Sequence, residues 1–212
     1  MDRREFLKRC ARVTGMVGVP TAAGAGFVAA YGTTEDHEIP IPGLGAAFDG
    51  YRIGYLSDMH IGPFLGDEWL AETIRRTIES DIDLLLIGGD FLWRPEAEWA
   101  LLRGFARNER LAATPRAAMP AAALDQLSGM LAGRSVPDGM FGVLGNHDRW
   151  TDGALCLREL PRAGVRLLVN EAVRITRKEQ QLEIYGVDDL WTGIPRKPVE
   201  ERGIPRILLA HN

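Results

Sequence analysis

Short apolar runs recur along the chain, and each ends in a glycine or a polar residue. Runs of this kind are typical of buried strands in a parallel sheet, which is covered on both faces. A helical segment lies between the first two runs, so residues 52–87 are predicted to form a βαβ unit. The runs that we interpret as strands with such ends are 52–57, 83–87, 140–144 and 206–210.

Apolar residues at helical spacing predict the helices that accompany these strands. The clearest example begins near residue 66, with Asp67 as its predicted N-cap. Its apolar positions are predicted to face the sheet, and they are Leu70, Ile74 and Ile78. Segments with the same helical character are 96–107, 121–131 and 154–160.

Two further regions have weaker patterns. Residues 108–120 contain two X-Pro pairs amid alanines and are predicted to be an inserted loop. Within 93–139, two interpretations stay open: a scaffold with a surface excursion, or a cap that selects substrate near the functional site. Alternation later in the chain predicts strands of a second sheet at 165–169, 173–176 and 182–187, with a polar hairpin connection at 177–181.

The N-terminal 34 residues differ from the rest of the chain. Arg3-Arg4-Glu5-Phe6-Leu7-Lys8 matches the twin-arginine export pattern, and residues 13–34 carry no charge. We interpret 1–34 as an export signal read by the twin-arginine machinery, with an uncleaved membrane anchor as an open alternative. The protein would then be periplasmic or held on the outer face of the cytoplasmic membrane. Residues 35–50 are predicted to be a linker with an extended edge segment near 39–44.

Composition narrows the class of protein. The chain has 212 residues, a formal net charge of −4, 46% hydrophobic and 25% charged residues, which is ordinary for a soluble globular domain. The body has no run of Lys and Arg, which argues against a nucleic-acid surface. Its two cysteines, Cys10 and Cys156, exclude a disulfide framework. Cys156 is predicted to be a buried residue of a helix.

The chemistry of the chain is concentrated at the ends of the predicted strands. Ligands in open α/β sheets gather beyond the carboxyl ends of the strands, so side chains there are predicted to converge. Any one of them alone could be a turn residue or an ordinary buried histidine. Together, carboxylate, imidazole and amide ligands without a thiolate predict a site for Mn, Fe, Zn, Co or Ni. The motifs are Asp58-x-His60, Gly89-Asp90, Gly145-Asn146-His147-Asp148 and His211.

In this order the motifs resemble those of the calcineurin-like metallophosphoesterases, over about residues 39–212. The resemblance implies a two-sheet α/β sandwich flanked by helices. It also implies a phosphodiesterase or phosphatase that uses two divalent transition-metal ions and a bridging hydroxide. With its N-terminus the chain resembles a twin-arginine, phosphodiesterase-type branch of the family, in which some relatives act on lipid-linked phosphate compounds.

The resemblance also implies a role for each residue of the motifs. Asp58 and His60 would hold the first metal, Asp90 would bridge both, and the second would be held by Asn146 and His211. His147 would protonate the leaving alkoxide, with Asp148 orienting its ring. Asp188 and Asp189 also follow a strand end, but the family uses that position structurally.

The chain departs from the family pattern beyond His211. Family members continue to a further strand and a Gly-His-x-His turn that completes the coordination of both metals. The domain at 51–212 is therefore predicted to be C-terminally truncated, without its C-terminal strands and with an incomplete metal site. The alternative is a catalytically impaired module that binds a metal or a partner. An exported nuclease is a third interpretation, which the acidic body argues against.

Overall fold

The computed structural model describes residues 33–94, 104–199 and 203–212. The chain divides into two units, Met1–Glu38 and Ile39–Asn212. The described residues of the first unit, 33–38, are exposed and have neither helix nor strand. All the elements below belong to the second unit. In the described ranges, no helix is both long and apolar enough to cross a bilayer.

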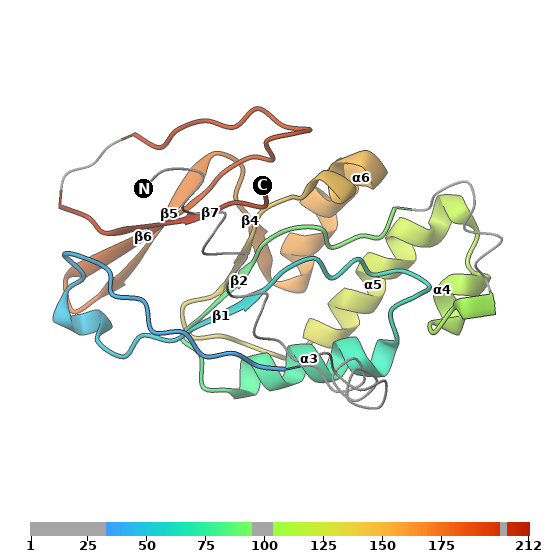
Figure 1. Ribbon diagram of the computed structural model, residues 1–212, viewed down its shortest axis with the longest axis horizontal. Coiled ribbons are helices and arrows are strands. Elements are labelled where there is room, and N and C mark those ends of the chain that lie inside the picture. The colour runs from blue at the N-terminus through green and yellow to red at the C-terminus, as the bar shows by residue number, and fades with distance from the viewer. Residues whose placement is uncertain (1–32, 95–103, 200–202) are drawn as a thin grey trace, which may run out of the picture. The chain divides into compact units, whose positions relative to one another are not determined.

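A parallel sheet forms the centre of the second unit (Figure 1). Its strands pair in the order β1-β2-β3-β4, and every pairing is parallel. The residues that follow the strands therefore emerge at one edge of the sheet. The strands are β1 (Ile53–Leu56), β2 (Leu84–Ile87), β3 (Met140–Gly142) and β4 (Val165–Leu167).

The assignment of residues 165–169 to the second sheet is wrong, because β4 pairs with β3 in the first sheet. Helix α6 (Asn146–Glu159) and the 3-10 helix η4 (Leu160–Ala163) cross over between β3 and β4. Gly164 ends the crossover at a φ of 86°, which turns the chain back. This is a second βαβ unit, and such units place their strands parallel in one sheet.

The second sheet contains a hairpin and one added strand. β5 (Glu171–Arg177) and β6 (Gln180–Gly186) are antiparallel, and β7 (Arg206–Leu209) pairs with β6 in parallel. The turn of the hairpin is Lys178-Glu179, and both residues have positive φ, which matches the twist of the two strands. The predicted strands at 173–176, 182–187 and 206–210 are thereby confirmed.

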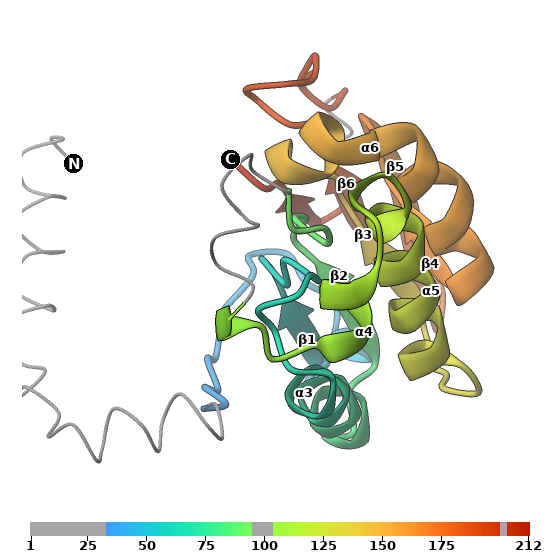
Figure 2. The same cartoon turned by 90° about the vertical axis from the view of Figure 1, so that its right-hand side faces the viewer.

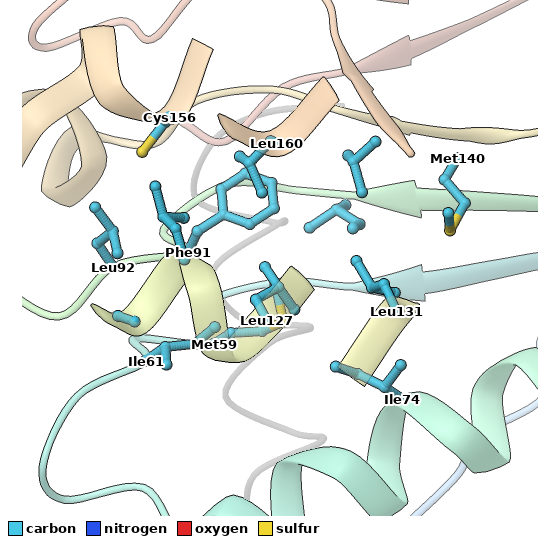
Figure 3. Packing of buried hydrophobic residues seen from close by; sticks show 14 of the residues in the cluster. Met59, Ile61, Ile74, Phe91, Leu92, Leu127, Leu131, Met140, Cys156 and Leu160 are labelled. Atoms are coloured by element: carbon cyan, nitrogen blue, oxygen red, sulfur yellow. The ribbon is translucent and has the colours of Figure 1, made fainter. Parts of the chain in front are cut away.

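Alternate side chains of the central strands face opposite layers. Leu85 and Ile87 belong to a core shared with the helices, whereas Leu84 and Leu86 pack against the second sheet. Helices α3 (Asp67–Glu79), α5 (Met119–Leu131) and α6 lie on the helical side (Figures 1 and 2). The predicted two-sheet α/β sandwich flanked by helices is therefore confirmed. Figure 3 labels core residues from these layers: Ile74, Leu127, Leu131, Met140, Cys156 and Leu160.

Helix α3 has the predicted buried face, with Leu70 and Ile74 almost fully buried. The prediction that Asp67 is its N-cap is wrong, because Gly66 is the N-cap and Asp67 is the first helical residue. The Asp67 carboxylate instead accepts a hydrogen bond from the Gln126 side chain of α5 at 2.9 Å. This bond joins the two helices.

Residues 108–120 do not form the predicted loop. Asn108 is buried and caps α4 (Glu109–Ala113) by accepting a hydrogen bond from the Leu111 N–H at 2.9 Å. The 3-10 helix η3 (Arg116–Ala118) then leads into α5, which starts at Met119. The predicted helix at 96–107 lies mainly outside the described residues, and its described part, 104–107, is not α-helical.

Two other boundaries differ from the prediction. Helix α6 starts at Asn146 instead of residue 154, and Asp152 interrupts it with non-helical dihedral angles. The Asp152 carboxylate caps the second half by accepting a hydrogen bond from the Leu155 N–H at 2.9 Å, so the prediction found only that half. The predicted edge segment near 39–44 forms no strand, and the 3-10 helix η1 (Ala46–Phe48) follows it.

Arg177 of β5 ties the second sheet to the loops that precede β2 and β3. Its guanidinium donates to Asp83 at 2.7 Å and to Asp138 at 3.0 Å. Partial burial alone would raise the pKa of Asp83, but hydrogen bonds from the Arg52 N–H and from Arg177 lower it below its usual value. A carboxylate with a lowered pKa stabilises the fold above its unfolded pKa and loses that contribution as the pH falls.

We expect Arg177→Gln to lower the free energy of unfolding by about 1–3 kcal/mol at neutral pH, since it removes charged hydrogen bonds. The difference from the unmodified protein should shrink as the pH falls below about 4, where Asp83 becomes protonated. Urea denaturation across this pH range measures both effects. Arg166→Gln removes an exposed ion pair with Glu171 and should cost less than about 1 kcal/mol. Equal costs for the two variants would contradict the prediction.

Candidate metal centre

The loops after β1 and β2 continue to pair beyond the strands. The Asp58 N–H donates to the Gly89 carbonyl at 3.0 Å, and the His60 N–H donates to the Asp90 carbonyl at 2.9 Å. Asp58, His60 and Asp90 all adopt the left-handed conformation, with φ of 53°, 41° and 52°. Such backbone costs about 1–3 kcal/mol per residue and gathers at functional sites. The fold therefore holds three predicted ligands in a strained but well-defined arrangement.

The loop after β3 meets this arrangement through the first turn of α6. Gly145 is the N-cap, so Asn146 and His147 are the first helical residues. The His147 N–H donates to Oδ1 of Asp90 at 2.9 Å. The N-terminus of a helix favours a nearby negative charge, so this turn stabilises the buried Asp90 carboxylate. β7 delivers His211 to the same place, where its Nε2 lies 3.0 Å from Oδ1 of Asn146.

Asp90 lies at the centre of the cluster. Its Oδ2 lies 3.4 Å from Nε2 of His60 and 3.4 Å from Nε2 of His211. Nε2 of His60 also lies 3.8 Å from Oδ1 of Asp58. Two groups of side chains among the described residues could hold a metal ion, and Asp90 belongs to both. The first group is His60, Asp90 and His147, and the second is Asp58, Asp90 and His211.

The cluster is buried on one side and open on the other. The side chains of Asp90 and His211 are only 4% and 7% exposed, whereas Asp58 is 57% exposed and His60 34%. The His60 ring meets the ring of His147 edge to face, with centroids 4.6 Å apart. A ligand can therefore approach past Asp58 and His60 while the far side stays dry.

The donor set fits a metal ion. Nδ1 of His211 lies 2.8 Å from the Gly88 carbonyl oxygen. When Nδ1 carries the proton and donates it to this oxygen, Nε2 keeps a lone pair. That lone pair then faces the amide oxygen of Asn146 and a carboxylate oxygen of Asp90. The Nε2 lone pair therefore has no donor between it and these two acceptor oxygens, which is unfavourable unless a cation lies among them.

Asp148 lies beneath this cluster and is fully buried. Its two carboxylate oxygens accept hydrogen bonds from the backbone N–H groups of Leu92, at 2.9 Å, and Gly145, at 3.0 Å. The pKa of Asp148 is raised to about 7, chiefly by burial and further by the nearby charge of Asp90, while the two backbone hydrogen bonds oppose the rise. The carboxylate thus joins the loop after β2 to the N-cap of α6.

Sequence reasoning missed several partners of the cluster. The Asn212 side chain donates to Oδ1 of Asn146 at 3.3 Å and to Oδ2 of Asp189 at 3.1 Å. The Ser57 hydroxyl donates to Asp58. Each of these residues is next to a predicted ligand or a strand end, so adjacency was the available signal. Adjacency alone does not say which side chains turn inward.

Two glycines let the loops after β2 and β3 approach closely. A Cβ on Gly89, where φ is 98°, would lie 2.7 Å from the backbone nitrogen of Gly145 and 3.0 Å from Nδ1 of His211. A Cβ on Gly145 would lie 2.1 Å from Oδ1 of Asp90. Both positions therefore exclude any side chain.

We expect Gly89→Ala to lower the free energy of unfolding by about 2–4 kcal/mol, because strain and a backbone clash coincide. Chemical denaturation measures this loss. The matched control is Gly129→Ala in α5, where the added Cβ meets nothing within 4 Å. That change should stabilise the protein by about 0.5–1 kcal/mol, since alanine is the better helix former. Normal stability of Gly89→Ala would show that the loops do not need this close approach.

The model of the calcineurin-like phosphoesterase family matches residues 51–212. Phosphodiesterase YaeI of Escherichia coli (strain K12) is 29% identical over 166 residues, covering 76% of this chain and 53% of that protein. An uncharacterized metallophosphoesterase of Aquifex aeolicus (strain VF5) is 34% identical over 65% of this chain and 42% of that protein. The uncharacterized metallophosphoesterase YkuE of Bacillus subtilis (strain 168) is 25% identical over 92% of this chain and 62% of that protein.

The chain thus spans about half the length of these curated relatives. The family match covers both sheets and all of the strand ends at which the described side chains converge. The chain belongs to the calcineurin-like phosphoesterase family.

Proposed function

We propose that the protein is a metal-dependent phosphoester hydrolase with a dinuclear centre. The observation that supports this best is the position of Asp90, which is shared by two groups of side chains able to hold a metal ion. A carboxylate shared in this way can bridge two ions. The name of the Escherichia coli relative, a phosphodiesterase, favours diesters as substrates.

The proposed ligand assignment is the one that the resemblance to the family implies, and the described distances between these side chains are compatible with it. Asp58 and His60, which lie on the exposed side of the cluster, would hold one ion. Asn146 and His211 would hold the second ion, and Asp90 would serve as a ligand of both. Divalent transition metals such as Mn, Fe, Zn, Co or Ni suit this mixture of oxygen and nitrogen ligands. When bound, the ions would lower the pKa of a water molecule and neutralise the charge of the phosphoryl oxygens.

His147 is the proposed general acid. Its ring lies beside that of His60, on the side from which a substrate can enter. There it would donate a proton to the leaving alkoxide. Asp148 would position it indirectly, because its carboxylate fixes the N-cap from which the His147 backbone follows. The hydrogen bond from the His147 N–H to Asp90 holds this part of the backbone against the cluster.

Metal removal and restoration test this function. Protein stripped with a chelator should not hydrolyse bis(p-nitrophenyl) phosphate, and addition of Mn²⁺, Zn²⁺ or Co²⁺ should restore hydrolysis. Elemental analysis should find two ions in each active chain. Hydrolysis that survives complete metal removal would refute the proposal, and so would a fully loaded protein that cleaves neither this diester nor p-nitrophenyl phosphate.

We further propose that the N-terminal segment directs export, so that the protein acts in the periplasm or at the outer face of the membrane, where a lipid-linked phosphoester would be within reach. Arg3 and Arg4 carry this proposal, because the twin-arginine route reads the pair as an address. Replacing both with Lys keeps the charge and should leave the protein in the cytoplasm. Fractionation with an antibody measures the distribution. Unchanged export would contradict a twin-arginine signal.

A further inference from the structure

A pocket of about 460 Å³ lies between the loop that follows β6 and the first turn of α6. Its walls include Arg149, Val169, Asn170, Asp188, Ile194 and Arg196. Both views show the chain after β6 running past α6 (Figures 1 and 2). None of these wall residues belongs to the proposed metal ligands.

The pocket adjoins the candidate metal centre. Arg149 follows Asn146 by three residues on α6, and residues at this spacing lie on one face, about 5–6 Å apart. On the opposite wall, Asn212 joins Asn146 to Asp189 through two hydrogen bonds, and Asp189 is the neighbour of Asp188. A substrate held at the centre could therefore extend a neighbouring group toward the pocket.

The acceptors on the pocket wall are already used. Asp188 accepts hydrogen bonds from Arg149 and from the Asp189 N–H on one oxygen, and from the Ile194 N–H on the other. The Asn170 side-chain oxygen accepts from the N–H groups of Asp188 and Arg196. Its amide nitrogen donates to the Ile194 carbonyl at 2.8 Å. A ligand that offers only donors would therefore find few free acceptor sites in these side chains.

The donors on the wall are not fully used. Nε of Arg149 is buried and has no hydrogen-bond partner in the described part of the chain. The Arg196 guanidinium is exposed, and none of the ion pairs within the described ranges includes it. Asp188 neutralises one of the two arginines, so the pocket keeps an excess of positive charge and of N–H donors. This is the complement of a phosphate, because guanidinium groups bind such oxyanions through several N–H groups at once.

We propose that this pocket binds a second phosphate group of the substrate, separate from the phosphoryl group that is cleaved. This assignment rests on the proposed function, and it narrows the substrate class to phosphodiesters with a further phosphate on one of the alcohols. Arg196 is the specificity-determining residue, since it supplies the unpaired charge. Arg149 forms the fixed wall, because its ion pair with Asp188 holds the loop after β6 against α6.

Calorimetry on metal-free protein tests the pocket without catalysis. Inorganic phosphate should bind in the millimolar range in the presence of a chelator. Arg196→Gln should weaken that binding about 10-fold or more, since it removes a charge-assisted contact. Lys197→Gln is the matched control, because it changes the same charge on the next residue outside the pocket wall, and it should change the affinity less than about twofold. Absent binding, or equal binding to Arg196→Gln, would overturn the proposal.

A second measurement shows whether the phosphate belongs to the substrate. Two diesters of p-nitrophenol are compared on the metal-loaded protein, one with an ethyl group and one with a phosphoethyl group. Arg196→Gln should raise KM for the phosphoethyl diester about 10-fold or more and leave kcat/KM for the ethyl diester unchanged. Unchanged KM for both would mean that the pocket takes only free phosphate, which overturns the substrate assignment. Failure to hydrolyse both of these diesters, bis(p-nitrophenyl) phosphate and p-nitrophenyl phosphate refutes the proposed hydrolase function, whereas calorimetry still decides whether the pocket binds phosphate.

Discussion

Asp90→Asn is expected to prevent binding of both proposed metal ions and to leave the fold intact. The substitution keeps the shape of the side chain and one oxygen that can accept the hydrogen bond from the His147 N–H. It removes the negative charge that lies 3.4 Å from Nε2 of His60 and of His211. Since this carboxylate is the member shared by both candidate groups, neither ion keeps its full set of charged ligands. We expect metal affinity to fall by about 10²-fold or more for each site, and hydrolysis to fall with it for every substrate.

Thermal unfolding separates this role from a structural one. In metal-free protein the charge of Asp90 repels the buried Asp148 carboxylate, so Asp90→Asn should unfold at the same temperature or higher. Adding Mn²⁺ or Zn²⁺ should raise the Tm of the unmodified protein, because a ligand that binds only the folded state stabilises it. The variant should lose that rise. A lower Tm without metal, together with a normal rise on adding it, would show that Asp90 is a structural residue.

Asp58→Asn is expected to have a smaller effect on metal binding than Asp90→Asn. Asp58 lies near His60 and belongs to only one of the two candidate groups, and its side chain is half exposed. Its replacement should therefore weaken one ion and spare the other. Elemental analysis should find about one ion per chain in this variant and almost none in Asp90→Asn. Equal losses would argue against a centre that is organised around Asp90.

The edge of the sheet that carries the site could be predicted from the sequence. The apolar runs that end in Asp58, Asp90 and Asn146 form adjacent parallel strands, and parallel strands end at one edge. His211 reaches the same cluster from the second sheet. Hydrophobic periodicity carried this information because strands buried on both faces leave few polar positions except at their ends.

Other features depend on contacts that periodicity does not encode. β4 is short and alternates, so its residues suited either sheet, and only the crossover through α6 fixes it beside β3. The start of α6 could not be predicted, because the sequence Gly145-Asn146-His147 is equally typical of a polar turn. The left-handed backbone of His60 is set by pairing with the loop after β2, a tertiary effect. The sequence led us to expect that Asp148 orients the ring of His147. In the structure the buried Asp148 carboxylate instead accepts hydrogen bonds from two backbone N–H groups.

The role of His147 is the main question that geometry raises. Its side chain lies close enough to His60 and Asp90 to share a metal with them. The same position, edge to face with His60 and beside Trp150 at 5.4 Å between ring centroids, also suits a proton donor at the mouth of the site. A ligand and a general acid respond differently to the pKa of the leaving group, so kinetics can separate the two roles.

We expect His147→Gln to keep its metal and to lose rate, by about 10²–10⁴, for diesters with alkyl leaving groups. Alkoxides are poor leaving groups and need the proton, whereas p-nitrophenolate leaves without one. Activated aryl diesters should therefore lose much less rate than alkyl diesters. Trp150→Phe, which keeps an aromatic ring beside His147, should behave like the unmodified protein in both assays. If His147→Gln instead loses metal, or slows aryl and alkyl diesters equally, His147 is a ligand and the proton must reach the leaving group from another donor.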